Sequence, residues 1–122
     1  MTEELITFDT AKLAKEEQYP IYNNLAKTGF YNIRTGTYIH FGRTGQQTAI
    51  HLCAAPTQSL LQRWLREEHS VLLTVEYSLS DDDWFHYIYK NDVWGSKYVH
   101  SNTYEESLEK GLQEALKLIN ND

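Results

Sequence analysis

One segment of the chain, residues 56–67 (PTQSLLQRWLRE), has the pattern of an amphipathic helix. Pro56 suits the first turn of a helix, because the amide that proline lacks would have no partner there. Four apolar side chains recur at helical spacing on one face, namely Leu60, Leu61, Trp64 and Leu65. The polar side chains on the opposite face are Gln62, Arg63, Arg66 and Glu67. The apolar face must be buried, so the chain should contain a surface that covers it.

A second amphipathic helix is predicted near the end of the sequence, over residues 103–119. Thr103 and Glu106 have the spacing of a capping box, in which each side chain reaches the backbone amide of the other residue. One face then carries residues that are apolar or small: Leu108, Gly111, Leu112, Ala115, Leu116 and Ile119. Gly111 costs about 1 kcal/mol of helix stability relative to alanine. We therefore expect it to mark a close approach of this helix to a sheet or to its partner helix.

The segment between the two helices is predicted to form antiparallel strands. Residues 71–77 alternate in polarity, which places Thr74 and Glu76 on one side of the strand. The other side carries Val71, Leu73, Val75 and Tyr77. Residues 78–83 form a polar turn, and residues 84–89 return as the second strand. A further short strand is expected near residues 94–99.

The first half of the chain contains shorter elements. An early strand is expected at residues 5–7, and Asp9 is a suitable N-cap for a short helix over residues 11–17. The tripeptide Arg-Thr-Gly occurs at residues 34–36 and again at 43–45, each time between two β-rich runs. Glycine supplies the positive φ that tight hairpins need, so we predict a meander of three strands, 31–33, 37–41 and 48–52.

Together these elements predict an α+β fold with a single domain over residues 1–122. We expect an antiparallel sheet of about four to six strands, with two main helices (about 57–68 and about 104–119) packed on one face, plus a short N-terminal helix. The predicted core consists of Leu61, Trp64, Leu65, Val71, Leu73, Val75, Leu112, Leu116 and Ile119.

Composition and charge exclude several classes of function. The formal net charge is −6, and the 11 lysines and arginines are scattered, so we expect no nucleic acid partner. No apolar run approaches the length of about 20 residues that spans a bilayer, which predicts no membrane partner. Residues 1–6 carry acidic side chains where a secretory signal would be basic. A cytoplasmic location is therefore expected.

No catalytic constellation can be identified. The single cysteine, Cys53, lies in an apolar run and suits the core better than a nucleophilic role. The five histidines lack the spacing of a metal motif, although His40, His51 and His86 all fall on expected strands. Residues 81–83 are three aspartates, but they lack the alternating ligands of a calcium loop. We therefore expect no catalytic residue, no metal and no cofactor.

The aromatic content, 13% of the chain, is the compositional excess that function could explain. If helices cover one face of the sheet, the strand at 84–89 leaves one row on the other face. That row is either Trp84, His86 and Ile88 or Phe85, Tyr87 and Tyr89. Such a row could bind a protein, a small ligand or a second copy of the chain, or it could only stabilise the sheet. The candidate binding residues are Tyr38, His40, Trp84, His86, Tyr87 and Tyr89.

Two runs of this sequence resemble a family of short uncharacterised proteins of phages and prophage-like regions of gut bacteria. The first is APTQSLLQ-WLRE within residues 55–67, and the second is TYEE-LE-GL-EALKLI within residues 103–119. The resemblance implies a phage-associated or mobile-element accessory protein of unknown activity and assigns no functional residue. Our first hypothesis is an interaction protein that binds a protein partner or small ligand. The alternative is a small enzyme whose pocket is not evident from the sequence.

Overall fold

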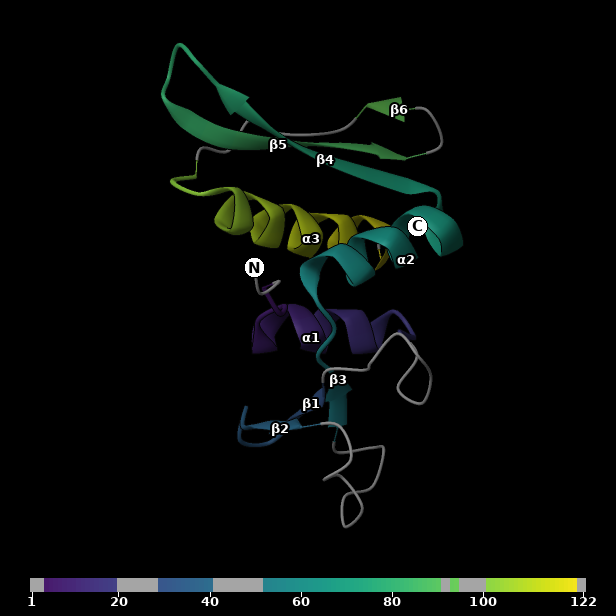
Figure 1. Cartoon of the computed structure of the whole chain (residues 1–122). Coiled ribbons are helices and arrows are strands. Elements are labelled where there is room, and N and C mark those ends of the chain that lie inside the picture. Colours follow the sequence, from purple (N-terminus) through teal and green to yellow (C-terminus); the bar gives the residue numbers. More distant parts are fainter. Residues whose placement is uncertain (1–3, 20–28, 41–51, 91–92, 95–100, 121–122) are drawn as a thin grey trace. The chain divides into compact units, whose positions relative to one another are not determined.

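The computed structural model describes residues 4–19, 29–40, 52–90, 93–94 and 101–120. These residues form three helices and six strands, so the α+β class predicted from the sequence is confirmed (Figure 1). The strands belong to two separate antiparallel sheets rather than to one. The chain divides into two compact units, residues 1–61 and 62–122, and each is described by itself. The single domain expected from the sequence stays a prediction.

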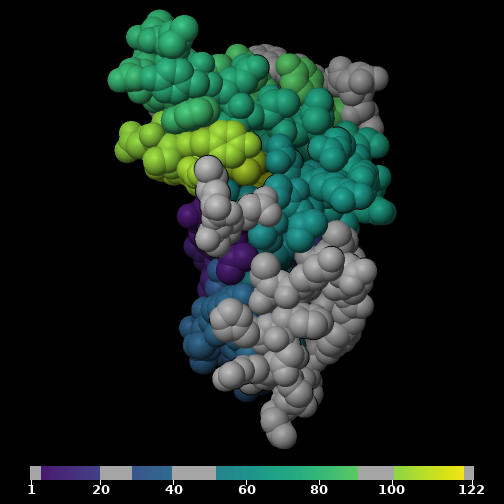
Figure 2. Space-filling view, in the orientation of Figure 1, coloured from purple at the N-terminus to yellow at the C-terminus, as the bar shows by residue number. Residues whose placement is uncertain are grey.

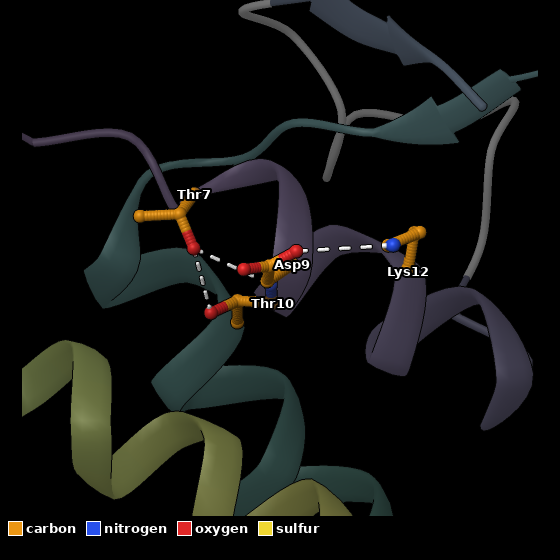
Figure 3. A network of polar contacts seen from close by, with 4 residues as sticks. All are labelled: Thr7, Asp9, Thr10 and Lys12. Atoms are coloured by element: carbon orange, nitrogen blue, oxygen red, sulfur yellow. Dashed lines mark hydrogen bonds and ion pairs between the residues drawn. The ribbon is translucent and has the colours of Figure 1, made fainter. Parts of the chain in front are cut away.

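The first unit contains helix α1 (Phe8–Glu16). Its N-cap is Thr7, whose side-chain oxygen accepts from the Thr10 amide at 3.3 Å, while the two hydroxyls lie 3.1 Å apart (Figure 3). Asp9, the N-cap predicted from the sequence, lies inside the first turn and pairs with Lys12 at 3.8 Å. That prediction was wrong because a threonine two residues earlier makes the same kind of bond.

The sheet of the first unit has β1 (Gly29–Asn32) at its centre. Strands β2 (Tyr38–His40) and β3 (Leu52–Ala54) flank it, in the order β2-β1-β3. Phe30 is paired with Ile39 on one side and with Ala54 on the other. The predicted meander was therefore wrong in its order, since the third strand pairs with the first. The connection over residues 41–51, including the second Arg-Thr-Gly, lies outside the described residues.

The first Arg-Thr-Gly makes the predicted hairpin turn between β1 and β2. Gly36 has φ of +75°, and its amide donates to the Asn32 carbonyl at 2.8 Å. The Asn32 side chain accepts from the amides of Arg34 and Thr35, which fixes the turn. Near the start of the chain, Leu5 forms an isolated bridge with Thr57 rather than a full strand.

The second unit contains β4 (Val71–Ser78), β5 (Asp83–Lys90), β6 (Val93–Trp94) and α3 (Tyr104–Asn120). Helix α2 (Gln58–His69) spans the boundary between the units. Strands β4 and β5 form a long hairpin from Val71↔Lys90 to Ser78↔Asp83, and β6 pairs with the end of β5. Residues 95–100, where a longer last strand was expected, lie outside the described part.

Helix α3 packs on one face of the β4–β5 hairpin (Figure 1). The closest approach is at Gly111. A Cβ placed there would lie 2.6 Å from Leu73 Cδ1 and 3.2 Å from His86 Cγ. This confirms that Gly111 marks a close approach of the helix, and the surface it approaches is the sheet. The Thr103 half of the predicted capping box is also present, since Thr103 Oγ1 accepts from the Glu106 amide at 3.1 Å.

The predicted core residues are buried with two exceptions. Val75 and Ile119 are only half-buried. The buried members are Leu61, Trp64, Leu65, Val71, Leu73, Leu112 and Leu116. Gln62, on the same helix as Trp64, donates from Nε2 to the Leu73 carbonyl at 2.7 Å, which ties α2 to strand β4.

Replacing Gly111 with alanine should destabilise the protein by about 1 kcal/mol, because overpacking a tight core contact costs more than the helix gains from alanine. Chemical denaturation of Gly111→Ala measures this change. Lys117→Ala, on the exposed side of the same helix, is the control and should change stability by less than about 0.5 kcal/mol. A Gly111→Ala variant more stable than the wild type would contradict the close approach.

Candidate functional site

The β4–β5 hairpin has two different faces. Residues that point toward α3 form one row on each strand, and these rows include Leu73 and His86, the two side chains beside Gly111. Because successive side chains of a strand point to opposite sides, the residues between these form the opposite face. It carries Leu72, Thr74 and Glu76 from β4, and Phe85, Tyr87 and Tyr89 from β5. We call this second surface the open face.

The open face carries exposed apolar side chains on neighbouring strands. Leu72 and Tyr89 are paired directly across the ladder, and their exposed fractions are 42% and 37%. Tyr87, opposite Thr74, is half-buried. Phe85 is buried, and its ring meets that of Tyr87 edge-on with 5.1 Å between centroids. The structure thus decides between the two rows that the sequence left open, since Phe85, Tyr87 and Tyr89 lie on the face away from α3.

His86 lies on the α3 side and is only 1% exposed. Burial lowers the pKa of His86, with a smaller opposing influence from Glu114 and a further lowering by Lys110, both on α3. A histidine whose pKa lies below its usual value of about 6.5 is mostly neutral at pH 7. The side chain of this candidate binding residue is therefore packed between strand and helix.

Two other candidates lie in the first unit. Tyr38 is half-buried on β2, where its ring meets that of Tyr31 at 5.8 Å. His40 ends β2, and its side chain lies outside the described part. The sheet of these two residues is not the sheet of Tyr87 and Tyr89, so the six candidates do not share one sheet face.

Trp84 belongs to a second aromatic group, which the sequence did not predict. Its ring meets Tyr77 at 5.1 Å and Tyr104 at 5.6 Å between centroids, both edge-on. Tyr77 faces Trp84 across the ladder, and Tyr104 is the first residue of α3. We call these three residues the aromatic cluster. The strand pairing could have been found from the hairpin pattern, but the position of Tyr104 depends on how α3 begins.

The acidic turn adjoins this cluster. The Tyr77 hydroxyl donates a hydrogen bond to the Asp82 carboxylate. This bond is the main reason that the pKa of Tyr77 is raised. Asp82 has φ of +53° in the turn that joins the two strands, and Ser78 Oγ accepts from the Asp81 amide at 3.3 Å.

The cysteine thiol is placed for packing rather than for nucleophilic attack. Cys53 is buried on β3, and burial raises the pKa of its thiol above the usual value. A thiol with a raised pKa forms less of the nucleophilic thiolate. Within the described ranges, no group of three or more histidine, cysteine, aspartate or glutamate side chains is arranged to hold a metal ion.

Comparisons with known proteins found no similar protein. No family model, curated protein or solved structure matches the chain. None of the helices in the described part combines the length and apolar character that crossing a membrane requires.

The lowered pKa of His86 predicts a pH dependence of stability. Well above its usual pKa of about 6.5, His86 is neutral in both the folded and the unfolded chain, so it contributes no slope. As the pH falls below that value, the unfolded chain binds a proton more readily at this site, and the free energy of unfolding should decrease. Denaturant unfolding at a series of pH values measures the slope.

The His86→Gln variant should show a shallower slope than the wild type between about pH 6.5 and 5, whatever its absolute stability. His69→Gln, at the half-buried end of α2, is the matched control for loss of a histidine. Equal slopes for His86→Gln and the wild type would show that His86 titrates alike in the folded and unfolded chains.

Proposed function

We propose that this chain is a binding protein that holds another protein chain against its open face. The single observation that carries the proposal is the exposed pair of Leu72 and Tyr89, which lie side by side on β4 and β5. The other face of the same hairpin is covered by α3. Helix packing therefore accounts for the apolar side chains on one side of the sheet but not for those on the other.

Such a surface is suited to binding a partner. Tyrosine offers a large contact area with few rotatable bonds. Covering exposed apolar side chains on neighbouring strands removes apolar surface from water, which stabilises a complex. Thr74 and Glu76 lie on the same face and would supply polar contacts around the apolar pair. A small enzyme, the alternative function, would need titratable groups that converge in a concave site. His86 is instead enclosed between β5 and α3.

Two kinds of bound chain fit this proposal. The resemblance to phage proteins supports an accessory role in a phage or mobile element, acting in the bacterial cytoplasm on a phage or host protein. A second copy of the chain is an equally suitable occupant, because a symmetric dimer would cover both open faces at once. Nucleic acid suits this surface poorly, since the net charge of the chain is −6.

Placing a charge on the open face should abolish association without unfolding the chain. Both Leu72→Glu and Tyr89→Glu are changes at exposed positions, which usually cost little stability. Leu79→Glu is the matched control, because Leu79 is 90% exposed in the hairpin turn and lies away from the open face. Sedimentation over a concentration series measures self-association, and capture from a phage-infected host lysate measures binding to other partners.

We expect the wild type and Leu79→Glu to behave alike, and Leu72→Glu and Tyr89→Glu to lose the dimer or the captured partner. The proposal fails if the wild type is monomeric and all variants capture the same proteins.

A further inference from the structure

The aromatic cluster lies on the opposite side of the hairpin from the open face. Trp84 stands in the row that points toward α3, and its ring is half-buried. The two tyrosines that meet it edge-on, Tyr77 and Tyr104, are 41% and 40% exposed. Figure 2 shows the hairpin end and the start of α3 along the same margin of the surface. The cluster therefore presents ring surface to solvent between a strand end and a helix start.

Three separate backbone anchors hold these rings in place. Tyr77 is fixed by its pairing with Trp84 in the hairpin ladder. Trp84 also forms a bridge with Ser101, with two backbone hydrogen bonds of 2.9 Å. Tyr104 follows Thr103, whose side chain caps α3. The backbone positions that carry the three rings are therefore fixed before a ligand binds, which lowers the ordering cost of binding.

The two segments that carry the cluster contain acidic side chains and no lysine or arginine. Residues 76–84 contain four carboxylates and no lysine or arginine, and residues 101–109 contain three carboxylates and no lysine or arginine. The next basic residue, Lys110, is paired with Glu106 at 3.2 Å. Aromatic faces carry negative potential, and carboxylates nearby reinforce it. The three rings and the Asp82 carboxylate, which the Tyr77 hydroxyl holds beside them, together suit a cation with a flat or apolar body.

We propose that the aromatic cluster of Tyr77, Trp84 and Tyr104 binds an arginine side chain of a partner protein. Arginine fits better than lysine because its guanidinium is planar, stacks on aromatic rings and is weakly hydrated. The Asp82 carboxylate, held by the Tyr77 hydroxyl, lies at the edge of the cluster, where it can accept from the guanidinium. This site uses none of the residues of the open face, so it stands or fails independently of the proposed function.

The test is a titration of the nitrogen-15-labelled full chain with a capped Gly-Arg-Gly peptide. The chain has three tryptophans, and the Trp84→Phe variant identifies the Trp84 indole signal in the spectrum. The same peptide with citrulline in place of arginine is the control, because citrulline keeps the shape and removes the charge. We expect a saturable shift of the Trp84 signal with the arginine peptide and a much weaker response to citrulline.

Variants locate the site. Tyr104→Ala should weaken arginine-peptide binding by about two- to fivefold, the size expected for one exposed cation–π contact, whereas Tyr104→Phe should retain it. Asp82→Asn should also weaken binding, and Leu72→Glu on the open face should leave it unchanged. The proposal is overturned if no signal saturates, if the citrulline peptide binds equally well, or if Tyr104→Ala binds as tightly as the wild type.

Discussion

The contact of Gly111 with Leu73 and His86 is the constraint on which the second unit depends. Without a side chain at residue 111, the backbone of α3 approaches β4 and β5 closely enough to bury Leu73 and His86 in the middle of one face of the hairpin. That burial lowers the pKa of His86 and encloses Leu73. Because alternate residues of a strand point to opposite sides, the same contact determines which side chains remain on the open face.

The two proposed surfaces both arise from this arrangement. Strand β5 alternates between them, since Trp84 and His86 point toward α3 while Tyr87 and Tyr89 point away. The α3 side is covered along the middle of the hairpin, but near the turn it ends in exposed tyrosines. One surface is therefore apolar with a few polar neighbours, and the other combines aromatic rings with carboxylates. A partner could engage either surface without competing for residues with a partner on the other.

Much of the second unit could be predicted from the sequence, and much of the first could not. The α2 and α3 helices and the β4–β5 hairpin follow from long periodic patterns. Gly111 stood out because glycine destabilises a helix, yet it lies on the apolar face of one. The split into two sheets and the central position of β1 depend on pairing across long separations, for which strands of three or four residues leave almost no pattern. The sequence likewise left two alternative rows of the strand at 84–89 for the open face. Only the packing of α3 shows which of the two rows lies there. The meeting of Trp84 with Tyr104 was missed for the same reason.

The distance between Gly111 and the sheet decides which face of the hairpin is covered, and nuclear Overhauser effects measure such distances in solution. The α-protons of Gly111 should give strong cross-peaks to the methyl groups of Leu73 and a cross-peak to the ring of His86. The methyls of Leu72, which point to the open face, should give none to Gly111. Absence of the Leu73 and His86 cross-peaks, or cross-peaks from Leu72 in their place, would contradict the assignment of the two faces.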